Sequence, residues 1–252
     1  MEEFRTFDDT RIVFQRWGPN SGAPPIVLHH GFVVDANLNW VGPGIVDALV
    51  QTGRQVVALD ARGHGRSEKP HDPDRYGETA MARDLMLLVD RLGVPQVDLV
   101  GYSMGAIVSL ITATQDARVR RLVVGGVGAA AVELGGVDTR VVPNEMLVGA
   151  LLADDPAQAS PAATGFRMLA DAIGGDRLAL AAQARSVHCE PIPLGRITAP
   201  TLVVAGDADP LAARPEVLTG AIPGASLVVV PGDHQLAVLS PLFSSAILGF
   251  LA

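Results

Sequence analysis

The chain has 252 residues, a length that suits one α/β domain with a large buried core. Its composition, 48% hydrophobic and 18% charged, excludes a disordered chain, and its net charge of −8 without any run of Lys or Arg argues against nucleic acid and membrane partners. The single cysteine, Cys189, excludes a disulfide framework and a cysteine zinc site, and with the acidic N-terminus it leads us to expect a cytoplasmic protein.

The first elements predicted along the chain form an antiparallel hairpin. Residues 3–17 contain two strand-like runs, EFRTF and RIVFQRW, separated by a polar turn. Short apolar runs follow, each ending in small or polar residues, at 24–31, 55–60, 96–101, 121–126, 201–207 and 226–232. Continuous rather than alternating apolar runs are typical of strands covered on both faces, as in a parallel sheet.

Helical patterns alternate with these strands, at about 41–52, 78–92, 104–115 and 240–251. This alternation predicts an α/β fold with a mostly parallel, doubly wound sheet and an antiparallel N-terminal hairpin. In such sheets, ligands bind at the carboxyl ends of the strands.

The interval 129–199 breaks the alternation. It contains no strand-like run, only helical pieces such as NEMLVGALLA, GFRMLADAI and DRLALAAQARSV. Because it is too long for an ordinary loop, we interpret it as a helical cap inserted into a single domain of residues 1–252. The alternative is that these are ordinary crossover helices of the main layer.

Ser103 stands where the predicted strand VDLV meets a helix, in the sequence Gly101-Tyr102-Ser103-Met104-Gly105. Glycines two residues before and after the apex allow a sharp turn and leave the serine exposed at a helix N-terminus. This arrangement favours a nucleophile. A serine that merely caps the helix is the alternative.

A serine nucleophile needs a general base and an acid that orients the base. Of the six histidines, only His234 follows the penultimate predicted strand, in a loop before the closing helix. For the acid we favour Asp209, in the loop after the strand TLVVA, over Asp207, which suits a turn, and Asp233, which adjoins the histidine in sequence.

Acyl transfer also requires two backbone N–H donors for the oxyanion. We assign them to Met104, directly after the nucleophile, and to Phe32, in the loop after the strand that ends at His30. We expect His30 to brace this loop at the edge of the substrate pocket rather than to act as the base.

The order Ser103, Asp209, His234, with H-G-F at 30–32 and D-A-R-G-H-G-R-S at 60–67, resembles the α/β-hydrolase fold superfamily in its small, cap-bearing serine hydrolase form, which includes esterases and haloperoxidases. The resemblance covers the chain outside the interval 129–199. It implies the α/β-hydrolase fold and an acyl-enzyme on the serine. It also implies a scaffold role for the segment 60–67, including His64 and Arg66.

The serine at position 103 disfavours epoxide and haloalkane chemistry, for which relatives use an aspartate. Hydrolysis of an ester, lactone or thioester, hydrolysis of a C–C bond, cofactor-free perhydrolysis and non-catalytic ligand binding stay open. Met146, Leu147 and Phe166 of the interval 129–199 predict a pocket for a small to medium, largely apolar substrate. The sequence has no cofactor motif, and we expect no metal, a small-molecule partner and a possible homo-oligomer.

Overall fold

The computed structural model describes residues 1–155 and 160–252. Within these residues, one sheet contains eight strands in the order β1-β2-β4-β3-β5-β6-β7-β8. The strands are β1 (Glu2–Arg5), β2 (Arg11–Trp17), β3 (Ile26–His29), β4 (Val56–Asp60), β5 (Val97–Tyr102), β6 (Val119–Gly125), β7 (Thr201–Gly206) and β8 (Ser226–Val230).

The sheet is parallel except at its N-terminal edge. β1 pairs with β2 and β2 pairs with β4 in antiparallel fashion, whereas every pair from β4 to β8 is parallel. β3, β4 and β5 are buried along their whole length. The predicted mostly parallel sheet with an antiparallel hairpin is therefore confirmed.

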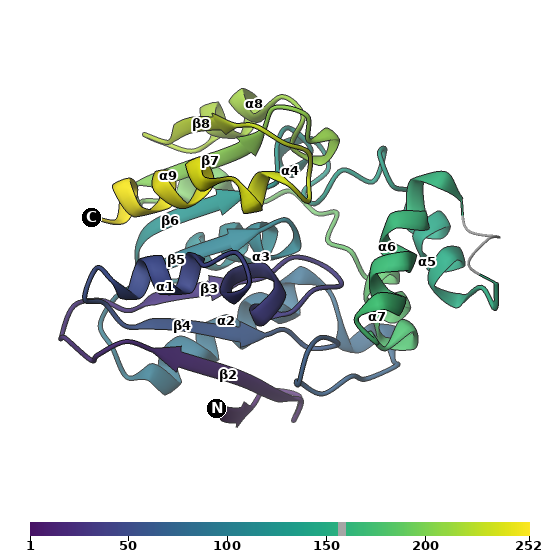
Figure 1. The fold of residues 1–252 in the computed structure, drawn as a ribbon, viewed down its shortest axis with the longest axis horizontal. Helices are drawn as coiled ribbons and strands as arrows, with labels where there is room; N and C mark the ends of the chain where they lie inside the picture. The colour runs from purple at the N-terminus through teal and green to yellow at the C-terminus, as the bar shows by residue number, and fades with distance from the viewer. Residues whose placement is uncertain (156–159) are drawn as a thin grey trace.

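Helices cover both faces of the sheet (Figure 1). On one face, α2 (Glu78–Leu92) and α3 (Met104–Ala113) share an apolar core with alternate strand residues. On the other face, α1 (Ile45–Val50) and α9 (Pro241–Leu251) build a second core. α2 shows why the sequence forms a helix here, because Met81, Leu85 and Leu88 recur at helical spacing and are fully buried.

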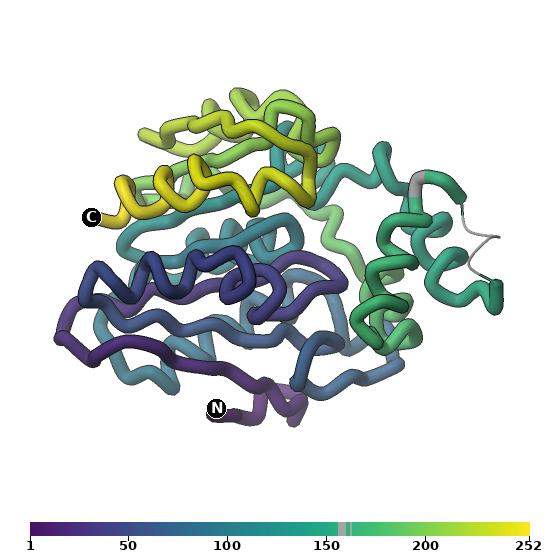
Figure 2. Tube along the Cα trace, viewed as in Figure 1, coloured from purple at the N-terminus to yellow at the C-terminus, as the bar shows by residue number. Residues whose placement is uncertain are grey.

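Three helices between β6 and β7 stand apart from these layers: α5 (Asn144–Leu152), α6 (Pro161–Ala172) and α7 (Arg177–Arg185). Figure 1 shows them gathered at one end of the sheet, and Figure 2 follows the chain out from β6 and back to β7. They bury a core of their own, mainly Leu and Ala, which also includes Val33 of the main body. We call α5, α6 and α7 the insertion helices.

Several elements differ from the sequence expectation. In place of one helix at 41–52, the structure has a π-helical turn at Asn37–Val41 and then α1, which begins at Ile45. Pro43 separates the two, because it has no backbone N–H to continue a helix. α4 (Ala130–Glu133) and α8 (Pro215–Ala221) were not anticipated, since helices of 4 and 7 residues are too short to show a clear period. None of the described helices has the length and hydropathy of a membrane span.

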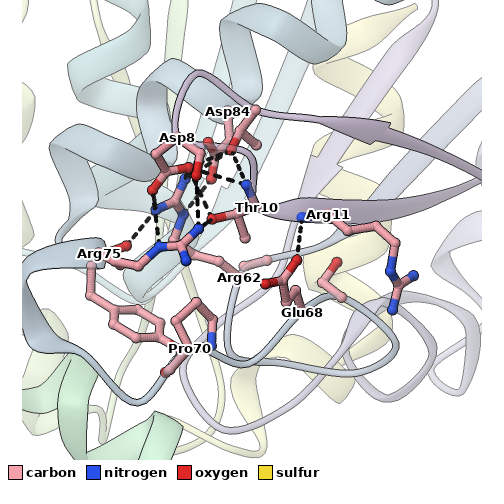
Figure 3. A network of polar contacts seen from close by, with 12 residues as sticks. Asp8, Thr10, Arg11, Arg62, Glu68, Pro70, Arg75 and Asp84 are labelled. Atoms are coloured by element: carbon pink, nitrogen blue, oxygen red, sulfur yellow. Dashed lines mark hydrogen bonds and ion pairs between the residues drawn. The ribbon is translucent and has the colours of Figure 1, made fainter.

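A buried polar network anchors the loop after β4 (Figure 3). The Arg62 guanidinium is fully buried and makes two hydrogen bonds of 2.7 Å to the carboxylate of Asp84 on α2. It also contacts Asp8, in the turn of the N-terminal hairpin, at 2.8 Å and 3.1 Å. Arg75 joins the same network through the hydroxyl of Thr10. The segment 60–67 is thereby tied to the first hairpin and to α2.

Candidate active site

Ser103 lies at the sharp turn between β5 and α3. Its backbone has φ 55° and ψ −118°, a conformation that residues with a side chain rarely adopt. A Cβ atom at Gly101 would overlap the carbonyl oxygen of Gly105, and a Cβ atom at Gly105 would overlap that of His29. The two glycines therefore allow strand and helix to approach closely, and the serine side chain is left at the apex.

Three side chains from separate loops meet at this apex. His234, in the loop after β8, has Nε2 at 2.9 Å from Oγ of Ser103. Its Nδ1 lies 2.8 Å from Oδ2 of Asp209, which follows β7. Because a carboxylate only accepts, Nδ1 donates to Asp209 and Nε2 is left to accept the serine proton. This is the geometry required of a nucleophile, a base and an orienting acid.

The other two candidate acids are occupied by backbone groups. Asp207 accepts the Gly232 N–H at 2.8 Å and so braces the loops after β7 and β8 against each other. Asp233 accepts the N–H groups of Gln235 and Leu236 at the next turn. Asp209 is thus the acid that the structure brings to the histidine, and its other oxygen accepts the N–H of Leu211.

Tyr102 holds the histidine loop, a contact that sequence reasoning missed. Its hydroxyl donates to the backbone carbonyl of His234 at 2.7 Å, and the two rings lie with centroids 5.3 Å apart. Burial raises the pKa of Tyr102, so the phenol remains a protonated donor. The tyrosine itself gave no signal, because its partner is 132 positions away.

The predicted oxyanion donors flank the serine. Within the described residues, neither the N–H of Phe32 nor that of Met104 has a protein acceptor. Asn39 fixes the loop before Phe32, since its Oδ1 accepts the Gly31 N–H at 2.8 Å. Val33 has φ 72°, a strained value for a β-branched residue. Phe32 and Met104 border the same cavity as Ser103, so both N–H groups stay candidates for the oxyanion.

His30 and His64 support the same loop. His30 accepts the Ala61 N–H at Nε2 (2.9 Å) and faces the Gly31 carbonyl at Nδ1 (2.7 Å). His64 in turn accepts the Val33 N–H at Nε2 (3.1 Å). Burial lowers the pKa of both histidines, so they act as neutral hydrogen-bonding groups. Neither has a ring nitrogen free to serve as a base.

Two cavities meet at Ser103. The inner cavity, of about 50 Å³, lies between the sheet and the insertion helices and is bordered by Met104, Leu147, Phe166, Glu78 and Gln183, among others. The outer cavity, of about 580 Å³, is bordered by His234, Phe32, Asn39, Phe166, Leu169 and Leu239, among others. Both walls are mainly apolar, which suits an organic substrate that reaches the serine.

The predicted pocket residues divide into two groups. Leu147 and Phe166 border the inner cavity. Met146 borders neither cavity and is 49% exposed, because α5 buries its other face through Leu147, Ala150 and Leu151. His30 also lies outside both cavities, beneath the loop that it braces. In the part of the chain that the structure describes, no group of three His, Cys, Asp or Glu side chains is arranged to hold a metal ion.

Comparisons with known proteins agree with this architecture. Residues 24–131 match the family model for the alpha/beta hydrolase fold. The chain is 36% identical over 103 residues to the non-heme chloroperoxidase of Streptomyces lividans, a match that covers 40% of the chain and 34% of that relative. It is 34% identical over 125 residues to an sn-1-specific diacylglycerol lipase of Danio rerio, covering 49% of the chain and 38% of the relative. These matches span less than half of either relative's length.

A solved structure extends the similarity to the whole chain. The crystal structure of a hydrolase from Pseudomonas aeruginosa superimposes with a TM-score of 0.80 and 27% identity, covering 100% of this chain and 98% of that one. The resemblance to the α/β-hydrolase superfamily that the sequence carries is confirmed, and so is the fold.

Proposed function

We propose that this α/β-hydrolase-fold protein is a serine hydrolase that cleaves a small to medium, largely apolar carboxylic ester through an acyl-enzyme at Ser103. The observation that carries the proposal is the chain of hydrogen bonds from Asp209 through His234 to the Ser103 oxygen, at 2.8 Å and 2.9 Å. The strained backbone of Ser103 supports the same proposal, since such strain is concentrated at functional sites.

In the first half of the reaction, Oγ of Ser103 bonds to the ester carbonyl carbon while its proton passes to Nε2 of His234. The N–H groups of Phe32 and Met104 stabilise the negative charge that develops on the carbonyl oxygen. The bond from that carbon to the alcohol oxygen then breaks, and His234 gives its proton to the departing alcohol. Asp209 stabilises the transient imidazolium charge.

In the second half, water replaces the alcohol. His234 takes a proton from the water as its oxygen bonds to the acyl carbon, and the same proton returns to Oγ of Ser103 as the ester bond to the enzyme breaks. The products are one carboxylic acid and one alcohol, and the enzyme is restored. No cofactor takes part in these steps.

The two cavities indicate how an ester would lie. The outer cavity contains His234, which must reach the departing oxygen, so we place the alcohol group there. The inner cavity reaches Ser103 without His234 and would hold the acyl group. In this proposal the segment 129–199 acts as a cap, because α5, α6 and α7 supply walls to the inner cavity and α6 also supplies a wall to the outer cavity. The cytoplasmic location and the possible homo-oligomer remain predictions from the sequence.

Perhydrolysis is the second candidate. It is favoured by the similarity to a protein named non-heme chloroperoxidase, which is 36% identical to this chain over 103 residues. On the same acyl-enzyme, hydrogen peroxide would take the place of water and release a peracid. C–C bond hydrolysis has no comparable observation in its favour.

The test uses p-nitrophenyl esters of rising chain length, with lactones and a β-diketone beside them, on the wild type and on Ser103→Ala. We expect ester hydrolysis that the substitution abolishes, together with stoichiometric labelling of Ser103 by an organophosphate. A folded wild type that neither hydrolyses any ester nor reacts with the organophosphate would instead favour a non-catalytic ligand-binding protein. Adding hydrogen peroxide and assaying peracid decides between hydrolysis and perhydrolysis.

A further inference from the structure

We propose that Gln183 selects the acyl group, and that the preferred substrates are esters of short acids carrying a hydroxyl group. This inference rests on the proposed ester hydrolysis and adds to it the chemical class of the acid.

Gln183, in the wall of the inner cavity, is a buried polar residue with an unpaired side-chain atom. It lies on α7, is only 3% exposed, and borders the cavity together with Met104. Its Nε2 contacts the sulfur of Met104. Its Oε1 is buried and has no hydrogen-bond partner among the described residues.

An unpaired buried amide oxygen is costly, because it has lost its water without gaining another donor. The two lone pairs of Oε1 can accept a hydrogen bond from an O–H group, but an alkyl chain cannot supply one. Because Oε1 has almost no accessible surface, the amide must turn toward the cavity to meet a ligand. A hydroxyl group on the acyl chain would then satisfy the oxygen, whereas an alkyl acyl group would leave it unpaired.

Besides Ser103, the other polar side chains in this wall are Glu78, Asp138 and Asn144. Oε2 of Glu78 already accepts the His188 N–H at 2.7 Å, and burial raises the pKa of Glu78, which favours its neutral form. Both oxygens of Asp138 accept hydrogen bonds of 2.7 Å from the Arg140 guanidinium, so its charge is already paired. The cavity is thus poorly suited to a charged ammonium group, and among the described residues the buried acceptor without a partner in this wall is that of Gln183. A neutral hydroxyl is the donor that fits Glu78 and Gln183.

The size of the inner cavity limits the acid. With about 50 Å³ against about 580 Å³ for the outer cavity, the inner cavity suits a short acyl chain better than a long one. A 3-hydroxybutyryl group is such a short chain. The 3-methylbutyryl group has the same shape, with a methyl group in place of the hydroxyl.

The test compares kcat/KM for the p-nitrophenyl esters of (R)- and (S)-3-hydroxybutyrate with that for 3-methylbutyrate, each divided by its rate of hydrolysis by hydroxide. We expect the wild type to prefer one hydroxy ester by about tenfold, and Gln183→Leu to lose that preference. The control Gln115→Leu, on an exposed glutamine after α3, should keep it. If Gln183→Leu does not fold, Gln183→Met serves the same purpose.

The outcomes separate this inference from the proposed function. Hydrolysis of all three esters that depends on Ser103, but with no preference in the wild type or with an equal preference in the Gln183 variant, overturns the role of Gln183 and leaves ester hydrolysis intact. Absence of hydrolysis for these and for every longer ester overturns the proposed function itself.

Discussion

The carboxylate of Asp209 lies 2.8 Å from Nδ1 of His234, although the two residues are 25 positions apart in the chain. Replacing Asp209 by Asn keeps the shape but presents an amide that can favour the wrong imidazole tautomer. We therefore expect Asp209→Asn to lower kcat by about 10⁴-fold, to be measured on the best ester of the panel.

Asp207→Asn is the matched control for this prediction. Within residues 1–155 and 160–252, the Asp207 side chain accepts one hydrogen bond, from the Gly232 N–H, which an Asn oxygen can also accept. We expect its kcat to stay within about threefold of the wild type. Equal losses in the two variants would show that Asp209 acts on the fold of the loop rather than on His234.

Tyr102→Phe removes the hydroxyl that donates to the His234 carbonyl and keeps the ring that packs against the imidazole. Since the loop loses one hydrogen bond worth about 1 kcal/mol, we expect the base to spend less time in line with Ser103. The predicted result is a kcat about five times lower with an unchanged KM, together with slower labelling by an organophosphate. A higher KM at constant kcat would contradict a positioning role.

The catalytic candidates were visible in the sequence for a topological reason. Ser103, Asp209 and His234 each follow a strand of a parallel sheet, and the carboxyl ends of parallel strands share one edge. A strand pattern and a short motif were therefore enough to bring them together. The same reasoning predicted the sheet and its first hairpin.

The supporting residues were not visible, because their roles depend on contacts between distant segments. Gln183 contacts Met104 across 79 positions, and nothing in the sequence of α7 marks that glutamine. Met146 shows the same limit of sequence reasoning, because it was expected in the pocket wall and borders neither cavity. It lies next to Leu147 in an apolar helix, and only the packing of α5 decides which of the two faces the cavity.

Gly105→Ala tests the close approach of α3 to the end of β3 beside the sharp turn around Ser103, which we call the elbow. The added Cβ would overlap the carbonyl oxygens of His29 and His30, which belong to backbone that cannot move aside. We expect the free energy of unfolding to fall by about 3 kcal/mol or more, and ester hydrolysis to be lost. Urea denaturation and the ester assay measure the two effects.

Gly149→Ala is the matched control for the elbow. Gly149 lies inside α5, and its Cβ would meet nothing within 4 Å. Because alanine is the better helix former, we expect this variant to be more stable by about 0.5–1 kcal/mol and fully active. A loss of stability similar to that of Gly105→Ala would mean that helical glycines in general, rather than the elbow, are sensitive.

The stability of the protein should depend on pH through His29. This histidine is buried in β3, and burial lowers its pKa to about 3. Between pH 6.5 and 3 the unfolded chain therefore binds a proton that the folded protein does not bind, so the free energy of unfolding decreases as the pH falls. For this one group, the decrease from pH 7 to pH 5 is about 2 kcal/mol.

Replacing the ionisable ring removes this contribution. We expect His29→Leu to lose about 2 kcal/mol less than the wild type between pH 7 and pH 5, measured by urea denaturation at both pH values. Since Nε2 of His29 has no partner among the described residues, the substitution abandons no hydrogen bond at that atom. Val27→Ala, in the same strand, should lower stability equally at both pH values, because it removes no titrating group. Parallel pH profiles for His29→Leu and the wild type would show that this imidazole can gain a proton without the chain unfolding.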